Sequence, residues 1–220
     1  MLTADLINHN IPRLQLQDSV GKARQLINDY KLTHLPVISE NTYLGLVSEE
    51  DLLDVEDERV PIELVQDCFI AASVPDQVHF LNAVNCSNQF DTNIVPVVKN
   101  QTIYLGVITT SDLLKTLGNF AGADEIGGII ILEMEHHQFA LSEISRIVES
   151  NDSTILHLNS TTNAKNGLLT VTLHLNRREL AAIIATFERY EYRVLYTYGT
   201  EKFENEVDTN YRHLMNYLHI

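Results

Sequence analysis

Two stretches of this chain, about sixty residues apart, carry almost the same pattern of residues. In each, an apolar residue, a proline and two branched aliphatic residues are followed by a turn, a glycine, two apolar residues, a hydroxyl residue and, three positions later, an aspartate. The first copy spans residues 35–53 and the second spans residues 95–114. Because the surroundings repeat along with the motif, the first half of the chain is predicted to fold as two similar units that pack on each other.

The composition narrows the possible partners. The chain has 15 Lys and Arg against 30 Asp and Glu, a formal net charge of -15, and this acidity disfavours nucleic acid and anionic membranes as partners. We find no long apolar run and no basic leader, and so expect a cytoplasmic protein without membrane insertion. Cys68 and Cys86 lie in segments predicted to be buried, without the spacing of metal ligands, and are expected to be reduced core thiols.

Each copy of the motif belongs to a predicted strand, helix, strand, strand and helix (βαββα). In the first repeat, Asp18 or Ser19 is expected to cap the first helix, and Ser48 to begin the second. The remaining first-repeat elements are a short strand within residues 11–16 and strands at 35–38 and 42–47. The second-repeat elements are a strand at 69–70, a helix after Asp76, strands at 94–98 and 103–108, and a helix from Thr109.

The remainder of the chain has its own periodicity. A glycine-bearing stretch at residues 118–125 is followed by a βαββαβ pattern of the ferredoxin-like type. The expected strands are residues 129–134, 154–159, 168–175 and 192–198, with helices near 141–148 and 180–187. We therefore divide the chain into repeat one at 1–57, repeat two at 58–120, a connector at 121–126, a third domain at 127–200 and a tail at 201–220 that forms a short docked or swapped helix.

The duplicated motif resembles that of the CBS domain, named for cystathionine β-synthase, and the resemblance covers roughly residues 6–117. It implies an α+β fold in which the two repeats pack through their sheets as a pseudo-two-fold module. It also implies two clefts, which in many relatives hold AMP, ADP, ATP or another adenosyl compound.

The resemblance assigns a nucleotide-binding role to four residues in each copy. The apolar-proline pair would face adenine, the hydroxyl residue at the helix N-terminus would contact phosphate or ribose, and the aspartate would accept the ribose diol. These residues are Leu35, Pro36, Ser48 and Asp51 in the first copy, and Val95, Pro96, Thr109 and Asp112 in the second.

A structural reading of the same residues stays open. In both copies the hydroxyl residue and the aspartate have the spacing of a capping box, which satisfies the free amides at the start of a helix. The alternative to a ligand sensor is therefore a structural or interaction module whose clefts bind no nucleotide.

The two copies differ just before the aspartate. Many nucleotide-binding relatives have a basic residue there, whereas this chain has Glu50 in the first copy and Ser111 in the second. Because Glu50 and its neighbour Glu49 would repel a polyphosphate, we favour the second cleft and a ligand such as AMP or another adenosyl compound over ATP. The bases that could offset phosphate charge are Lys22, Arg24, His34 and Lys99.

The βαββαβ segment resembles an ACT domain, a regulatory fold that often binds amino acids between its first strand and first helix. Residues 135–141 lack the glycine found at that turn, which favours dimerisation or partner docking over an amino-acid site. A metal site is disfavoured because His136 and His137 are adjacent and would point apart; the other candidate ligands are Glu133 and Glu135.

One face of the predicted third-domain sheet is half apolar. His157 and His174 are expected on it with Ile155, Thr170 and Thr172, opposite the apolar set that includes Leu156, Leu158 and Leu173. A partner is expected to cover it, since such a face is unusual in a monomer.

Taken together, these patterns predict a non-catalytic regulatory protein. No nucleophile elbow, phosphate-binding loop, dinucleotide fingerprint or zinc motif occurs in the sequence, so no catalytic or metal-binding residue is assigned and no cofactor is required. The expected partners are a small adenosine ligand, a second copy of the chain in a homodimer, and a protein whose identity the sequence does not reveal.

Overall fold

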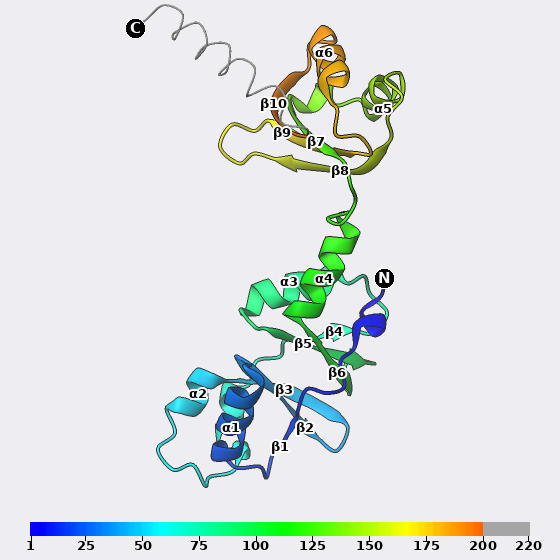
Figure 1. The fold of residues 1–220 in the computed structure, drawn as a ribbon. Helices are drawn as coiled ribbons and strands as arrows, with labels where there is room; N and C mark the ends of the chain where they lie inside the picture. Colours follow the sequence, from blue (N-terminus) through cyan, green and yellow to red (C-terminus); the bar gives the residue numbers. More distant parts are fainter. Residues whose placement is uncertain (200–220) are drawn as a thin grey trace, which may run out of the picture. The chain divides into compact units, whose positions relative to one another are not determined.

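The computed structural model describes residues 1–199 and contains two compact units, which divide between Leu117 and Gly118 (Figure 1). Each unit has its own sheet and its own hydrophobic core, and the predicted α+β class is confirmed. The helix expected within residues 201–220 lies outside the described residues. Among residues 1–199, no helix combines the length and the apolar character that a bilayer crossing needs.

The first repeat of unit 1 has the predicted order of elements. Its longer helix is capped by Ser19, whose hydroxyl accepts a hydrogen bond from the Lys22 amide at 3.2 Å, and it ends at Lys31, where a φ of 55° closes the last turn. The elements are β1 (Leu14–Gln15), α1 (Val20–Tyr30), β2 (His34–Ser39), β3 (Thr42–Ser48) and α2 (Glu49–Leu53).

The second repeat follows the same order. Residues 69–70, predicted as its first strand, form only an isolated bridge, between Ile70 and Leu46, and the short strand parallel to β5 is β4. The elements are β4 (Val74–Pro75), α3 (Leu81–Phe90), β5 (Ile94–Lys99), β6 (Ile103–Thr109) and α4 (Thr110–Phe120), with 3-10 turns η1 (Thr3–Leu6) and η2 (Ile62–Cys68) before the two repeats.

All six strands of unit 1 join in one sheet, in the order β1-β2-β3-β6-β5-β4. Exchanging the two repeats leaves this order unchanged, as a pseudo-two-fold axis between β3 and β6 requires. The central pairing is short: Thr42 lies opposite Ile103, and the Tyr43 amide donates to the Thr102 carbonyl at 2.8 Å. Buried side chains of both repeats form a single core, so the repeats are packed together and are not two independent domains.

The segment that leads into each repeat lies against the other repeat. We call residues 7–13 the first lead-in and residues 69–73 the second lead-in. In the first, the Asn8 amide donates to the Val107 carbonyl on β6 at 2.7 Å. In the second, Ile70 and Leu46 on β3 exchange two hydrogen bonds of 2.9 Å. The two lead-ins therefore interlock the repeats.

The glycine of each motif permits this close approach. A Cβ at Gly106 would lie 2.5 Å from a side-chain carbon of Ile7, and a Cβ at Gly45 would lie 2.8 Å from the Phe69 Cβ. Both glycines also have a positive φ, 152° and 156°. The conformation and the contact both call for a residue without a side chain.

Unit 2 has the ferredoxin-like βαββαβ order that was predicted. Its antiparallel sheet has the strand order β10-β7-β9-β8, with both helices on one face (Figure 1). The elements are β7 (Gly128–Met134), the 3-10 turn η3 (His136–Gln138), α5 (Leu141–Glu149), β8 (Ile155–Thr162), β9 (Leu169–Leu175), α6 (Ala181–Arg189) and β10 (Arg193–Tyr198).

The alternation predicted for the start of β8 is wrong. The register with β9 shifts between Ile155 and His157, so that Ile155 packs against the core and Leu156 is 40 % exposed. This bulge reverses the expected faces of these two residues, because an extra residue in one strand moves its neighbours across the sheet. His157 pairs with His174.

The burial predicted for Cys68 is also wrong, because its side chain is exposed whereas Cys86 is buried as expected. Cys68 ends η2, whose backbone departs from helical angles at Val65. Only Ile62 of this turn is fully buried, so the chain has left the core before it reaches Cys68.

Candidate functional site

The two helix N-termini that follow the repeated glycines have the same hydrogen-bond pattern. The Ser48 hydroxyl accepts from the Asp51 amide at 3.0 Å and donates to the Asp51 carboxylate at 2.5 Å. The Thr109 hydroxyl accepts from the Asp112 amide at 3.1 Å and donates to the Asp112 carboxylate at 2.7 Å. Both copies therefore contain a helix cap, and in both a carboxylate oxygen is held in place by its own hydroxyl partner.

The first amide of each helix is also occupied. The Glu49 amide donates to the Thr33 carbonyl at 2.9 Å, and the Thr110 amide donates to the Asn93 carbonyl at 3.0 Å. Because two of the first three amides of each helix already have partners in the protein, little of either N-terminus is free to bind a chain of phosphates.

The apolar-proline pairs are buried in unit 1. Leu35 and Val95 are fully buried in the core, and Pro36 and Pro96 are buried as well. Their predicted contact with an adenine ring stays a prediction. They lie in β2 and β5, where the hydrophobic sequence is satisfied by burial within the shared core.

The first copy has an acidic surround. Glu49 and Glu50 are exposed beside Ser48, and His34 pairs across the strands with Ser48. Burial lowers the pKa of His34, although the nearby carboxylates of Asp51, Asp91 and Glu50 act in the opposite direction. An imidazole held toward its neutral form adds little positive charge for a phosphate.

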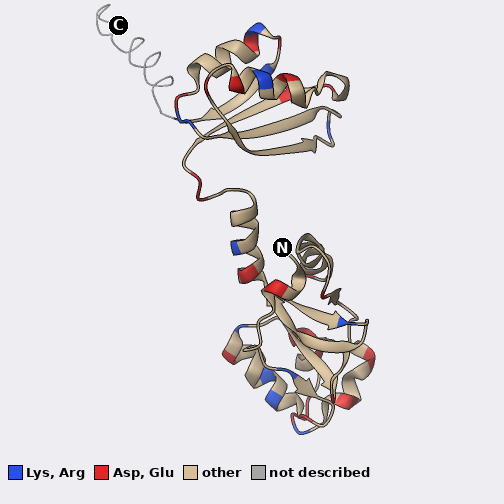
Figure 2. Cartoon of the chain, turned by 90° about the vertical axis from the view of Figure 1, so that its right-hand side faces the viewer, with Lys and Arg blue, Asp and Glu red and all other residues tan. Residues whose placement is uncertain are grey.

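The bases that the sequence singled out are mostly engaged elsewhere. The Lys22 ammonium pairs with Asp18 at 2.7 Å. The Arg24 guanidinium pairs with Glu58 at 2.9 Å and donates to the backbone carbonyls of Leu52 and Val55. Lys99 is exposed at the end of β5. In the view of Figure 2, Lys and Arg are interspersed with Asp and Glu instead of forming a basic face.

The two lead-ins give the motif copies unlike surroundings. The first lead-in and β6 line a cavity of about 320 Å³. Its polar lining residues, which sequence reasoning did not select, are Asn8, His9, Asn10, Arg13 and Tyr104. The corresponding second lead-in beside β3 has the sequence Phe-Ile-Ala-Ala-Ser. The run of amide and basic residues at 8–13 was a signal that could have been noticed.

The cavity of the first lead-in belongs to the second motif copy. It is lined by Gly106, the first residue of the motif segment that ends at Asp112. Gly106 and Thr109 are three positions apart along β6, a span of about 10 Å. Burial raises the pKa of the Tyr104 phenol to about 12. The positive charge of Arg13 has a smaller effect in the opposite direction.

The turn after β7 in unit 2 is held by local contacts. The Glu135 amide donates to the Gln138 side chain at 3.0 Å, and His137 lies 3.1 Å from the Glu135 carboxylate. Within residues 1–199, no three His, Cys, Asp or Glu side chains are placed to hold a metal ion. A neighbouring cavity of about 400 Å³ contains the buried carboxylate of Glu133, which pairs with Arg193 at 2.5 Å.

Comparison with known proteins supports the resemblance seen in the sequence. Residues 4–58 match the family model of the CBS domain. Over 127 residues the chain is 24% identical to a homoserine O-acetyltransferase of Methanobrevibacter ruminantium, and over 163 residues it is 26% identical to an uncharacterized protein of Methanocaldococcus jannaschii. These matches cover 53% and 66% of this chain, but only 24% and 37% of the relatives. The chain therefore spans less than half the length of the curated relatives it matches.

A solved structure has a similar fold over about half of this chain. It is that of a CBS domain pair/ACT domain protein from Thermotoga maritima, with a TM-score of 0.50 and 18% sequence identity. The match covers 55% of this chain and 98% of the other. The predicted resemblance to a CBS domain pair is confirmed at the level of fold.

Proposed function

We propose that this CBS-domain-pair protein is a non-catalytic regulator that binds an adenosine-containing ligand in the cleft of its second motif copy. The ligand lies between the first lead-in and the helix that begins after Thr109. Unit 2 acts as an ACT-like domain that joins two copies of the chain and docks a protein partner.

The difference between the two lead-ins carries this proposal. The motif residues themselves do not distinguish the clefts, because both copies have the same cap geometry. Beside the second copy, however, Asn8, His9, Asn10 and Arg13 supply polar groups around a cavity, whereas the residues beside the first copy are largely apolar. A ligand rich in ring nitrogens and hydroxyls therefore has more hydrogen-bond partners beside the second motif copy than beside the first.

Asp112 is the residue proposed to hold the ribose. One carboxylate oxygen accepts from the Thr109 hydroxyl, which orients the group and leaves the other oxygen for a ribose hydroxyl. Arg13 is the one Lys or Arg that lines the cavity, so a single phosphate is better matched than three. AMP or another adenosyl compound is therefore favoured over ATP.

Asp51 provides a matched control for Asp112. Both aspartates accept the same hydroxyl contact in the same helix cap, so Asp51→Ala and Asp112→Ala should lose similar stability, about 1 kcal/mol each. AMP should raise the melting temperature of the wild type and of Asp51→Ala, but not of Asp112→Ala. Native mass spectrometry of protein purified without added nucleotide identifies a retained ligand and tests the homodimer.

The alternative, a structural or interaction module, makes a different prediction. If neither AMP, ATP nor another adenosyl compound shifts the melting temperature, and both variants lose only the stability of the cap, the motif aspartates are structural. A shift that disappears in Asp51→Ala instead would assign the ligand to the first copy and refute the role given to the lead-ins.

A further inference from the structure

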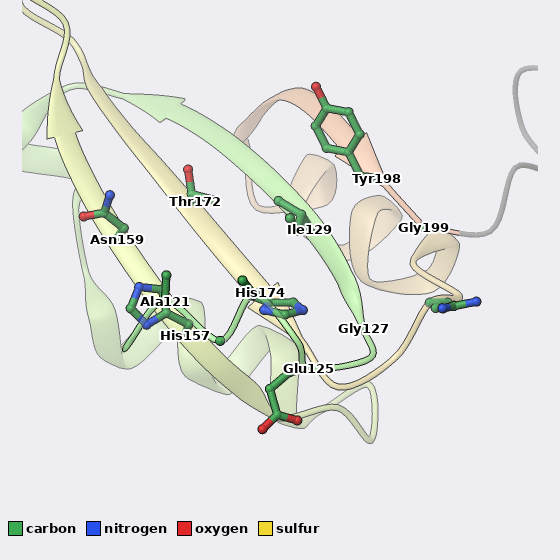
Figure 3. Close-up of a pocket in the computed structure, with 13 residues that line it drawn as sticks. Ala121, Glu125, Gly127, Ile129, His157, Asn159, Thr172, His174, Tyr198 and Gly199 are labelled. Atoms are coloured by element: carbon green, nitrogen blue, oxygen red, sulfur yellow. The ribbon is translucent and has the colours of Figure 1, made fainter. Parts of the chain in front are cut away.

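The open face of the unit 2 sheet, opposite its helices, carries a cavity of about 760 Å³ (Figure 3). Side chains of β8 and β9 form its floor, and residues of the connector that precedes β7 form one wall. Its volume lies within the range of small-molecule sites. Neither motif copy contributes to it.

Two imidazoles lie side by side on the floor. His157 and His174 occupy paired positions on adjacent antiparallel strands, and Figure 3 shows both facing the cavity. The connector passes close to His174: a Cβ at Gly122 would lie 3.6 Å from the ring Nδ1, and one at Gly127 would lie 2.9 Å from Nε2. The His174 ring therefore lies against this stretch of backbone, although the tightest contact of a Cβ at Gly127 would be with the Leu175 carbonyl oxygen, at 1.9 Å.

The polar side chains of this cavity are mainly hydrogen-bond donors without partners. Within the part of the chain that the structure describes, none of six such side chains has a hydrogen bond or an ion pair. They are His157, Asn159, Thr172, His174, Arg178 and Tyr198. Glu125 is the one carboxylate among the lining residues. The chain as a whole has twice as many acidic as basic residues, whereas hydrogen-bond donors outnumber carboxylates among the residues that line this cavity.

We infer that this cavity binds a small anionic ligand, one that carries a carboxylate or a phosphate group. Its oxygens are acceptors for imidazole, amide and hydroxyl donors, and Arg178 supplies positive charge among the lining residues. Two imidazoles without a third ligand do not make a metal site, which agrees with the absence of a suitable group of three among residues 1–199. The inference is independent of the nucleotide proposed for unit 1.

Histidine ring signals in NMR spectra of the full chain test this inference residue by residue. Inorganic phosphate and succinate are added separately, with sodium chloride of equal ionic strength as the blank. At least one probe should shift the His157 and His174 ring signals saturably and leave those of His136 and His137 unchanged. A shift with phosphate but not with succinate indicates a phosphoryl ligand, and the reverse indicates a carboxylate ligand. If each probe causes a shift, negative charge is sufficient for binding.

Variants identify the groups that bind. The double variant His157→Gln/His174→Gln should weaken binding of the effective probe about tenfold or more by calorimetry, and Arg178→Ala should weaken it as well. The matched control His136→Gln/His137→Gln replaces two histidines of the same unit that do not line the cavity, and it should bind the probe normally. The inference is wrong if neither phosphate nor succinate causes a saturable shift. It is also wrong if the ring signals of His136, His137, His157 and His174 all shift equally.

Discussion

Thr33 and Asn93, which hold the same position in the two repeats, are hydrogen-bonded to each other. The Thr33 amide and hydroxyl donate to the Asn93 side-chain oxygen at 3.0 and 3.2 Å, and the Asn93 amide donates to the Thr33 hydroxyl at 3.2 Å. The Asn93 side chain also donates to the Lys31 carbonyl at 2.9 Å. These two equivalent positions therefore form one contact with each other, and this contact joins the two repeats of unit 1.

Loss of this contact should lower the unfolding free energy of unit 1, and the effects of substituting its two residues should not be additive. Asn93→Ala removes the acceptor and the donor to Lys31, and is expected to cost about 1–2 kcal/mol of unfolding free energy; Thr33→Ala should cost about 1 kcal/mol. In the double variant, chemical denaturation should give less than the sum of the two losses, because each substitution removes the same shared bonds. Strict additivity would show that the two side chains do not interact in solution.

Alanine at the motif glycines should destabilise the module through the lead-ins. Gly106→Ala would force Ile7 away from β6, and Gly45→Ala would displace Phe69, so that each is expected to cost about 1–3 kcal/mol. Gly118→Ala is the control, since its Cβ would meet no atom closer than 3.8 Å and it lies in α4, where alanine is the better helix former. Thermal melts showing equal behaviour of all three variants would contradict the close packing.

His34 should make stability depend on pH in the mildly acidic range. Burial lowers its pKa from 6.5, so below pH 6.5 the unfolded chain binds a proton that the folded chain resists. This contribution to stability is therefore present above pH 6.5 and is lost as pH falls toward the lowered folded-state value. Denaturation midpoints at pH 5.5 and 7.5 should differ less in His34→Gln than in the wild type, and an identical difference would exclude this role.

Tyr192 should make stability depend on pH in the alkaline range. Burial and its hydrogen bond to Glu143, 2.8 Å long, raise its pKa from 10 to about 12. The folded state therefore keeps a proton that the unfolded chain releases, and stability falls as pH rises from 10 to about 12. Tyr192→Phe should reduce this fall in a urea titration, and an unchanged fall would contradict the role given to Tyr192.

The elements of both units could be predicted because each has a local pattern. A cap residue, a run of apolar spacing or a proline-containing strand leaves its mark within a few residues, as at Ser19 and in β2. The bulge at Leu156 could not be predicted, since it depends on pairing with a distant strand and leaves the local sequence of apolar residues unchanged.

The candidate site was predictable in part for a similar reason. The hydroxyl and carboxylate of Thr109 and Asp112 lie three residues apart, and their contact follows from the geometry of one helical turn. The polar lining at Asn8 and Arg13 comes from about a hundred residues earlier in the chain, where a single backbone bridge to β6 leaves no periodic pattern. The polar run at 8–13 is visible in the sequence, but its position beside β6 depends on a distant contact that only the folded structure shows.

Because each lead-in lies against the other repeat, unit 1 cannot be completed until most of its chain has been synthesised. Asn8 leaves the ribosome about a hundred residues before Val107, with which it pairs. The first repeat alone can form its helix and hairpin, but the segment that precedes it has no place to bind until β6 is made. Unit 1 should therefore close in one late step, and a ribosome stalled between the repeats would present a half-module with an unpaired sheet edge to chaperones.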